Sequence, residues 1–429
     1  MSSAALFMIL LPFLVFLVAG MPIAFSLIAT SILYLLAKGI PLSLIAHRMC
    51  FSLDSFPLLA IPLFILAGKL MNTGGISRRI FRFANCLVGH IRGGLGHVNV
   101  VCSIIFAGMS GTALADVGGL GEIELKAMDE AGYDLEFSSA ITLASATIGP
   151  IIPPSVPLII YGVLAEVPVT RLFLAGFLPG IVMAILLMVA VYFYAKKRNY
   201  PTMPRATWKE LTASFLSALP AMLSPIIIIL GMTTGIFSPT EAAGIAVVYA
   251  LILGGLVYKE LSFASLKTIT REVVESSTMV MFVIAAALLF SWVISAEQIP
   301  QMIAQWILTV GNTPFKFLVF VNILLLVLGM FMENNAIMLL LIPIIVPAGV
   351  SMGIDPVHLG IIMVLNITTG LLTPPVGLAL YIMKDMTGLS FERTVKAIVP
   401  FLIPLLAALI IITFNQEITL FLPRLLLGN

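Results

Sequence analysis

Residues 141–165 read ITLASATIGPIIPPSVPLIIYGVLA, and residues 361–383 read IIMVLNITTGLLTPPVGLALYIM. Both stretches are apolar, and each is interrupted by a glycine that is followed four residues later by a Pro-Pro pair. Proline removes a backbone hydrogen-bond donor and glycine permits non-helical backbone, so each stretch is predicted to be a helix with an unwound centre. Within a membrane, unwound backbone survives only where it is buried in protein or lines a polar cavity.

The two stretches belong to a longer repeat within the chain. Residues 108–179 can be laid over residues 329–400 without a gap, which is a displacement of 221 residues. The identical positions are mostly Gly and Pro, and repeated helix breakers indicate that both copies unwind at the same place. Paired discontinuous helices are typical of secondary transporters, where they form the substrate and ion sites. A simple kink between packed helices remains the alternative for either copy taken alone.

The composition indicates an all-α, polytopic membrane protein. Hydrophobic residues make up 60% of the 429 residues and charged residues only 10%, against roughly half and a quarter in a soluble domain. Three scattered cysteines predict neither a disulfide framework nor a metal site. No basic run alternates with aromatic residues, so we expect no nucleic-acid partner. The apolar run at residues 4–37 is too long for one span of ~20 residues and is predicted to be two retained helices in a tight hairpin.

Each half of the chain is predicted to contain five spans and one re-entrant hairpin. The first copy (1–195) is expected to contain scaffold helices, an interfacial arm at 76–92, a hairpin at 98–130 and a broken helix at 141–165. After a cytoplasmic linker (196–218), the second copy (219–429) is expected to contain an arm at 297–311, a hairpin at 316–351 and a broken helix at 358–383. The first apolar leg of each hairpin has ~12 residues, about 18 Å of helix, which cannot cross a hydrocarbon core of ~30 Å.

The distribution of basic residues predicts the orientation of the two copies. Because each half has an odd number of spans, the second copy would enter the membrane with the opposite orientation. With the linker in the cytoplasm, 17 of the 22 Lys and Arg residues lie on the cytoplasmic side and 5 lie outside. Cytoplasmic loops are enriched in Lys and Arg, so this distribution favours an inverted repeat with both termini outside.

Three long motifs resemble the large membrane subunit of tripartite ATP-independent periplasmic (TRAP) transporters. They are AGMSGTALADVGGLGEIELKAMDEAGYD at 107–134, TIGPIIPPSVPLIIYGV at 147–163 and GIDPVHLGIIMVLNITTGLLTPPVGLALY at 353–381. The resemblance extends over essentially the whole chain. It implies an elevator-type secondary transporter of the bacterial inner membrane that imports organic acids, is driven by Na⁺ and has no organic cofactor. It also implies two partners: a separate small four-helix membrane subunit and a soluble periplasmic binding protein.

Candidate ligands gather at the hairpin tips and the helix breaks. Hydroxyl groups, amides and freed carbonyls are hard oxygen ligands that suit a dehydrated Na⁺, and helix N-termini would favour a substrate carboxylate. In the first copy the candidate ion and substrate ligands are Ser110, Gly111, Thr112, Ser145, Thr147, Gly149, Pro150, Pro153 and Pro154. In the second copy they are Glu333, Asn334, Asn335, Asn366, Thr368, Thr369, Gly370, Thr373, Pro374 and Pro375. Close packing of the small residues at the first tip, without a ligand, remains the alternative.

We make separate predictions for the ionisable residues outside these groups. Asp116 follows the first tip, and a carboxylate within the membrane is a functional candidate by default. The segment 122–136, which includes Glu124, is expected to be mostly a solvated hairpin base. His90, His97 and His358 are expected in polar loops.

Other classes of function were weighed against the tripartite transporter. The chain has no HExxH, GxSxG or P-loop motif, so we expect no enzyme. A channel would need polar groups along a continuous path, whereas here they gather in two clusters. A stand-alone Na⁺/anion symporter of similar elevator architecture stays open, because only the family motifs distinguish it. Sialic acid and C4-dicarboxylates are both candidate substrates.

Overall fold

The computed structural model describes residues 3–73, 75–299, 302 and 313–428. All regular elements in these ranges are helices, which confirms the all-α class. Seven helices of the described chain are long and apolar enough to cross a bilayer. Helices α6 (Gly94–Ser110) and α7 (Ala113–Gly119) meet at an angle of 119° and pass the same test as a bent pair. The protein is therefore a multi-pass membrane protein.

The first half begins with a helical hairpin, α1 (Ser3–Val18) and α2 (Ile23–Lys38), as the length of its apolar run predicts. The other helices of this half are α3 (Ser43–Leu53), η1 (Phe56–Leu59), α4 (Ala60–Thr73), α5 (Ile76–Val88), α6, α7, α8 (Gly121–Glu130), α9 (Leu135–Ala146), α10 (Val156–Leu164) and α11 (Val169–Arg198). Helix α5 covers most of the expected arm at 76–92 and buries Ile80 and Phe83, while Arg82 is exposed. Helix α3 has no counterpart among the expected elements.

The second half continues the chain as a series of helices. They are α12 (Trp208–Thr233), α13 (Pro239–Leu251), η2 (Ile252–Val257), α14 (Phe263–Ala296), α16 (Pro314–Gly329), α17 (Asn334–Ser351), α18 (Pro356–Gly370), α19 (Leu378–Thr387), α20 (Phe391–Phe414) and α21 (Gln416–Leu427). The expected arm at 297–311 lies almost wholly outside the described residues. The linker is shorter than the expected 196–218, because α11 continues to Arg198 and a capping box of Thr207 and Glu210 starts α12.

The hairpin legs are longer than expected. Helices α6 and α16 have 17 and 16 residues, because each helix begins in the polar sequence that precedes the apolar leg. The returning helix α17 has 18 residues and is long and apolar enough to cross a bilayer. The length of its legs therefore does not show that the second hairpin is re-entrant. For the first hairpin, the bend between α6 and α7 indicates a re-entrant path more strongly than the leg length does.

The helix boundaries repeat with the same displacement of 221 residues as the sequence. Helix α7 begins at Ala113 and α17 at Asn334, while α9 begins at Leu135 and α18 at Pro356. The segment 43–73, which contains α3, η1 and α4, corresponds in this register to the single long helix α14. The duplication therefore includes the backbone elements and is not limited to the Gly and Pro positions.

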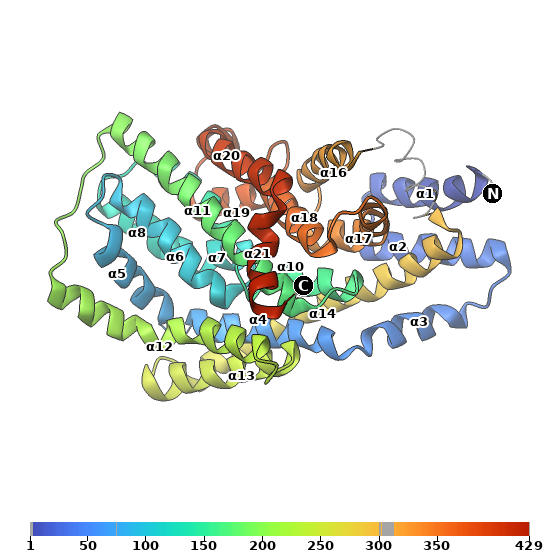
Figure 1. Ribbon diagram of the computed structural model, residues 1–429, viewed down its shortest axis with the longest axis horizontal. Coiled ribbons are helices and arrows are strands. Elements are labelled where there is room, and N and C mark those ends of the chain that lie inside the picture. The colour runs from blue at the N-terminus through green and yellow to red at the C-terminus, as the bar shows by residue number, and fades with distance from the viewer. Residues whose placement is uncertain (1–2, 74, 300–301, 303–312, 429) are drawn as a thin grey trace.

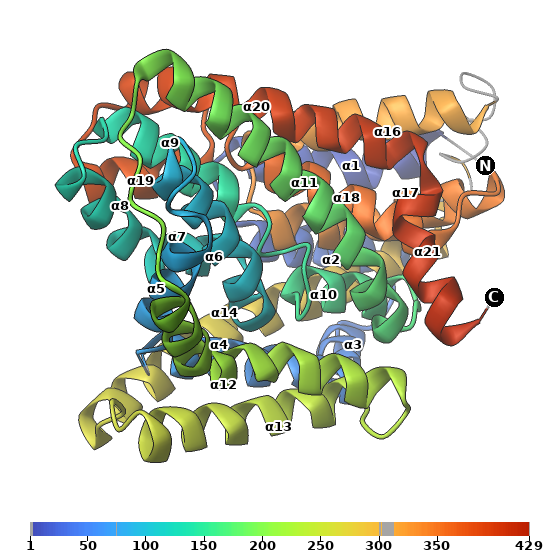
Figure 2. The same ribbon diagram turned by 60° about the vertical axis from the view of Figure 1, so that its left-hand side comes forward.

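The helices pack in two groups. In one group, α14 packs against α2, α3 and α4, and α13 packs against α4 and α12. Helices α12 and α13 run side by side along one edge of the molecule in both views (Figure 1, Figure 2). The other group contains both hairpins, both broken helices, α11 and α20. Within it, α10 packs against α17 and α18 of the second copy, while α19 packs against α9 of the first copy. This exchange places both helix breaks at contacts between the two copies within the second group.

Candidate functional site

The first helix break separates α9 from α10 and is fully buried. Every residue from 147 to 155 is buried, and the Pro153-Pro154 peptide bond is cis. The carbonyls of Thr147, Gly149 and residues 151–154 accept no hydrogen bond from the described part of the chain. A buried carbonyl without a partner is unfavourable by several kcal/mol in a membrane, so these oxygens favour a bound cation.

The second break, between α18 and α19, has the same backbone but lies closer to the surface. The Pro374-Pro375 bond is also cis, and the carbonyls of residues 372–376 accept no hydrogen bond from any described residue. Gly370 is buried, Pro374 is half-buried and Pro375 is exposed. The two breaks therefore offer similar backbone oxygens in different surroundings.

Each hairpin tip forms a backbone hydrogen bond to the break behind it. The N–H of Val156 donates to the carbonyl of Gly111 at 3.3 Å, and the N–H of Gly377 donates to the carbonyl of Met330 at 3.0 Å. Val156 and Gly377 occupy the same position in the repeat. A tip and its break are thus held together by a backbone N–H at the start of the half-helix that follows the break.

Glycines allow the tips to approach the breaks closely. Gly111 has φ +66°, and a Cβ atom there would lie 2.7 Å from the carbonyl oxygen of Pro154, so both conformation and space require glycine. In the second copy, a Cβ atom on Gly370 would lie 2.7 Å from the Cα atom of Gly329. Each copy therefore uses glycine for a close backbone contact between hairpin and break, although Gly111 and Gly370 are not equivalent positions of the repeat.

Two asparagines that were not candidates connect the hairpins to the broken helices. The Ser145 hydroxyl donates to Asn99 Oδ1 at 2.5 Å, and Asn366 Nδ2 donates to Asn322 Oδ1 at 2.7 Å. Ser145 and Asn366 occupy the same position in the repeat, whereas Asn99 and Asn322 lie on the first legs of their hairpins. A lone amide within an apolar leg is the sequence signal that could have identified them.

The predicted hydroxyl ligands donate to their own helices. Thr147 Oγ1 donates to the Ala144 carbonyl and Thr368 Oγ1 to the Val364 carbonyl, both at 2.6 Å. Thr369 and Thr373 make similar bonds to carbonyls one turn earlier, at 2.8 and 3.0 Å. Because a hydroxyl that donates still has oxygen lone pairs, these groups can also bind a cation.

The second copy also contains amide oxygens without partners. The Oδ1 atoms of Asn334, Asn335 and Asn366 are buried and accept no hydrogen bond within the described residues. Buried polar atoms in folded proteins are nearly always paired, so three unpaired oxygens around one hairpin indicate a ligand site. Neutral oxygens of this kind suit a monovalent cation.

The tip side chains also cap helices. The Ala115 N–H donates to Thr112 Oγ1 at 3.3 Å, and the Ala336 N–H donates to the Glu333 carboxylate at 3.2 Å. Glu333 also accepts a hydrogen bond from Asn335 Nδ2 at 2.9 Å. Ser110 is the last residue of α6. Glu333 therefore has a structural role at the start of α17 in addition to its position at the tip.

A cavity lies where both tips meet both breaks. It has a volume of about 130 Å³ and is lined by Thr112, Ala113, Leu114, Pro150, Pro157, Glu333, Asn334, Asn335 and Leu371. A larger hollow of about 390 Å³ shares Thr112, Leu114 and Asn335 with it and extends to Lys69 and Asn72 on α4. Of the predicted residues, the structure brings Thr112, Pro150 and the 333–335 tip to this cavity. The predicted residues 145, 147, 366, 368 and 369 are buried outside its lining.

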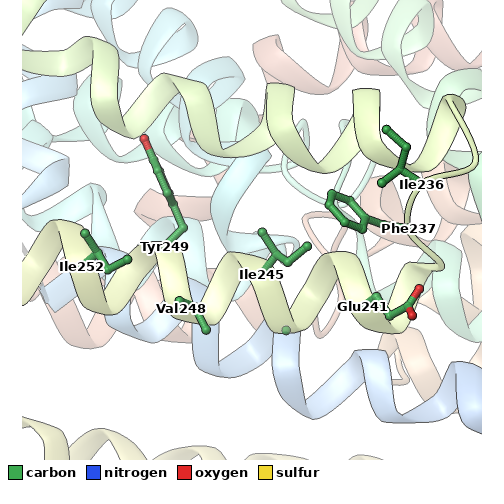
Figure 3. A pocket seen from close by; sticks show the side chains of 8 residues that line it. Ile236, Phe237, Glu241, Ile245, Val248, Tyr249 and Ile252 are labelled. Carbon is green, nitrogen blue, oxygen red and sulfur yellow. The ribbon is translucent and has the colours of Figure 1, made fainter.

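Another hollow lies along α13 and the turn that precedes it (Figure 3). Its volume is about 680 Å³, and Ile245, Val248 and Ile252 line it together with other apolar side chains. Its two polar side chains already have partners, since Glu241 accepts from the Ser238 N–H at 2.8 Å and Tyr249 donates to the Pro220 carbonyl at 2.6 Å. This hollow suits an apolar chain and not a carboxylate.

His90 lies in the turn after α5, as expected, whereas the expectations for two other histidines are wrong and that for the segment 122–136 has an exception. His97 and His358 lie on helices α6 and α18 and not in loops, and each is only 3% exposed. His358 Nδ1 forms a hydrogen bond with Thr419 Oγ1 at 2.8 Å, which explains its burial. Glu124 does not belong to a solvated base, because α8 packs against α9 and buries it to 2% exposure.

Comparison with known proteins finds similar transport proteins. The family model described as "Tripartite ATP-independent periplasmic transporter, DctM component" matches residues 10–418. The chain is 45% identical over 411 residues to the sialic acid TRAP transporter large permease protein SiaM of Vibrio cholerae, with 96% of both chains covered. It is 43% identical to the C4-dicarboxylate TRAP transporter large permease protein DctM of Pseudomonas aeruginosa, which covers 86% of this chain and 87% of the relative. The solved YdaH transporter of Alcanivorax borkumensis shares the fold, with a TM-score of 0.64 over 86% of each chain at 13% identity.

Proposed function

Because this chain belongs to the DctM family of tripartite ATP-independent periplasmic transporters, we propose that it is the large membrane subunit of a Na⁺-coupled importer of organic acids. Membership in this family of permeases makes it a multi-pass protein of the bacterial inner membrane. Its relatives are named as permeases for sialic acid and for C4-dicarboxylates, and both substrates are carboxylates. The observation that carries the proposal is the cavity at which two hairpin tips and two helix breaks meet.

We assign one Na⁺ to each break. In the first copy, the unpaired carbonyls of the break and the hydroxyls of Ser145 and Thr147 supply oxygen ligands. In the second copy, the carbonyls of residues 372–376, the Asn366 amide oxygen and the Thr368 hydroxyl supply them. Each bound Na⁺ would supply positive charge beside the cavity and hold the tip against its break, which orders the substrate site.

The substrate carboxylate is assigned to the side chains of the two tips. Thr112, Asn334 and Asn335 line the cavity and carry hydroxyl and amide groups that can donate hydrogen bonds. Helix α17 begins at Asn334, so the positive end of its dipole favours an anion there. The nearby Glu333 carboxylate accepts from the Ala336 N–H and from Asn335, which moderates its repulsion of a second carboxylate.

Transport would follow from movement of the second helix group against the first. In this proposal the two copies are an inverted repeat, the hairpins and broken helices form the moving part, and α1–α4 with α12–α14 form the scaffold. The larger hollow leads from the tips to Lys69 and Asn72, at the end of α4 that the charge distribution places in the cytoplasm. This hollow is the proposed route of release. Each net positive charge moved inward gains ~2.3 kcal/mol per 100 mV, so two Na⁺ with one monovalent acid would concentrate the acid in the cell.

Uptake in proteoliposomes tests this function. The chain is reconstituted with its small membrane subunit and binding protein, and labelled sialic acid and a C4-dicarboxylate are offered separately. We expect uptake of one acid under an inward Na⁺ gradient and faster uptake when the interior is negative. A K⁺ gradient of the same size is the control. Equal uptake in Na⁺ and K⁺ would refute Na⁺ coupling and leave the family assignment intact.

A further inference from the structure

Two carboxyl groups are buried inside the first hairpin without an ion-pair partner. Asp116 on α7 and Glu124 on α8 are each 2% exposed. Both carboxylate oxygens of Asp116 and Oε1 of Glu124 lack a hydrogen bond of normal geometry among the described residues, and the Ser103 side chain of α6 is the one neutral polar group that interacts with Asp116 there. None of the ion pairs within the described ranges includes either residue. An ionised carboxylate in such a place would be unfavourable by several kcal/mol, so this pair requires a bound positive charge.

Few other charged or titratable groups near Asp116 and Glu124 could pair with them or share a bound ion. Asp116 and Glu124 interact electrostatically with each other and with the buried Cys102 of α6. The other titratable groups on the helices packed against α7 and α8 are His97 of α6 and Glu136 of α9, which is paired with Arg393. Helix α8 itself also carries Glu122, Lys126, Asp129 and Glu130, and all four are exposed. The described residues contain no group of three or more His, Cys, Asp or Glu that could hold a metal ion. A proton needs no further ligands, whereas a metal ion does.

The second copy shows that the hairpin fold does not need these carboxyl groups. The positions equivalent to Asp116 and Glu124 are Ile337 and Ile345, which are 0% and 4% exposed. Apolar side chains fill the same places in the repeated backbone. The two acids of the first copy therefore have a role other than packing.

Helix α7 separates this pair from the larger hollow. Leu114, Ala115 and Gly118 line the hollow, while Asp116 faces the interior of the hairpin. A Cβ atom at Gly118 would meet nothing within 4 Å, so this side of the helix faces open space. A small rotation or shift of α7 would therefore connect Asp116 to water in the hollow.

We propose that Asp116 and Glu124 form a proton-binding site that holds at least one proton in this conformation and exchanges it as α7 moves. On binding, an O–H bond forms between a carboxylate oxygen and a proton taken from water, and the same bond breaks on release. The coupling to transport rests on the proposed function: a Na⁺ at the first break places positive charge beside the hairpin and favours the ionised pair. Binding of a proton to the pair and binding of Na⁺ at the first break would then weaken each other.

Infrared spectroscopy of the full chain in lipid nanodiscs tests the proton directly and needs no transport. At neutral pH the wild type should show the C=O stretching band of a protonated carboxylic acid, which decreases when Na⁺ is added. The double variant Asp116→Asn/Glu124→Gln should lack this band, and its neutral isosteres preserve the shapes. Glu122→Gln is the matched control, because Glu122 is an exposed residue of the same helix. A wild-type spectrum without the band, or a band that neither Na⁺ nor pH changes, would overturn the proposal.

Uptake by the reconstituted complex tests the coupling. In the wild type, lowering the pH by one unit should raise the half-saturating Na⁺ concentration up to tenfold across the range in which the pair titrates. In Asp116→Asn/Glu124→Gln this concentration should not depend on pH, while Glu122→Gln should behave as wild type. A pH effect that survives in the double variant would refute the coupling. If uptake shows no Na⁺ dependence in any protein, the proposed function fails, and the infrared result still decides whether the proton site exists.

Discussion

Replacing Thr368 with valine removes one predicted Na⁺ ligand while it keeps the shape of the side chain. Thr368 is 1% exposed, and its hydroxyl donates to the Val364 carbonyl at 2.6 Å. That carbonyl lies inside α18, so the helix retains its backbone hydrogen bonds when the hydroxyl is lost. The free energy of unfolding should fall by only about 1 kcal/mol, the net contribution of one such hydrogen bond.

The effect on Na⁺ binding should be larger than the effect on stability. A bound Na⁺ that loses one of several buried oxygen ligands should bind roughly 1–3 kcal/mol more weakly, which is about a 5- to 150-fold change in affinity. Uptake in proteoliposomes at saturating acid should therefore show a half-saturating Na⁺ concentration raised by that factor. Thr147→Val at the equivalent position of the first copy should behave similarly, because its hydroxyl is also buried and donates to a carbonyl at 2.6 Å.

Thr394→Val is the matched control for both variants. Thr394 is buried in α20, and its hydroxyl donates to the Ser390 carbonyl at 3.2 Å, but it lies outside the tips and breaks. It should lose similar stability and keep the wild-type Na⁺ dependence. If all three variants respond alike, or if neither Thr368→Val nor Thr147→Val shifts the Na⁺ dependence, the hydroxyls are packing groups and the assignment of the ion sites is wrong.

Three other predictions follow from the same structure. Gly111→Ala should reduce uptake strongly, whereas Gly132→Ala should not, because both glycines have positive φ but only Gly111 lies against the Pro154 carbonyl; a thermal unfolding curve for each variant separates stability from transport. In a cysteine-free background, a cysteine at the exposed Thr202 should resist an impermeant external thiol reagent and one at the exposed Ser43 should react, and labelling of Thr202 from outside would contradict the inverted topology. The purified chain alone should show negligible uptake until the small subunit and binding protein are added, without ATP; strong uptake by the chain alone would favour the stand-alone symporter.

The sequence predicted the backbone of the site better than its side-chain contacts. Glycine and proline act locally, so Gly149 and Pro153 reveal a break in a helix without knowledge of what packs beside it. The contact between Asn99 and Ser145 depends on how α6 lies against α9, which no local pattern contains. Asn99 was therefore missed although Ser145 was a candidate.

Burial of charged residues was the weakest sequence prediction. Glu124 lies in a polar stretch with acidic and basic neighbours, and such a stretch usually faces solvent. Its burial depends on which face of α8 packs against α9. A helix as short as α8 has too few turns for the spacing of its apolar residues to identify that face. The same limitation applies to His358, whose partner Thr419 is contributed by the last helix of the chain.

The two copies share a backbone but differ in their side chains, and this difference bears on how the ion sites would work. The first break is fully buried, and two acids lie in the hairpin that covers it. The second break is partly exposed, neutral amides and the capping carboxylate of Glu333 lie near it, and isoleucines replace the two acids. A cation at the first break would therefore depend on movement of the hairpin and on its proton, whereas a cation at the second break could exchange with water more directly. Duplication of the backbone thus supplies two sets of carbonyl ligands, and divergence of the side chains gives the two proposed sites different access and different sensitivity to pH.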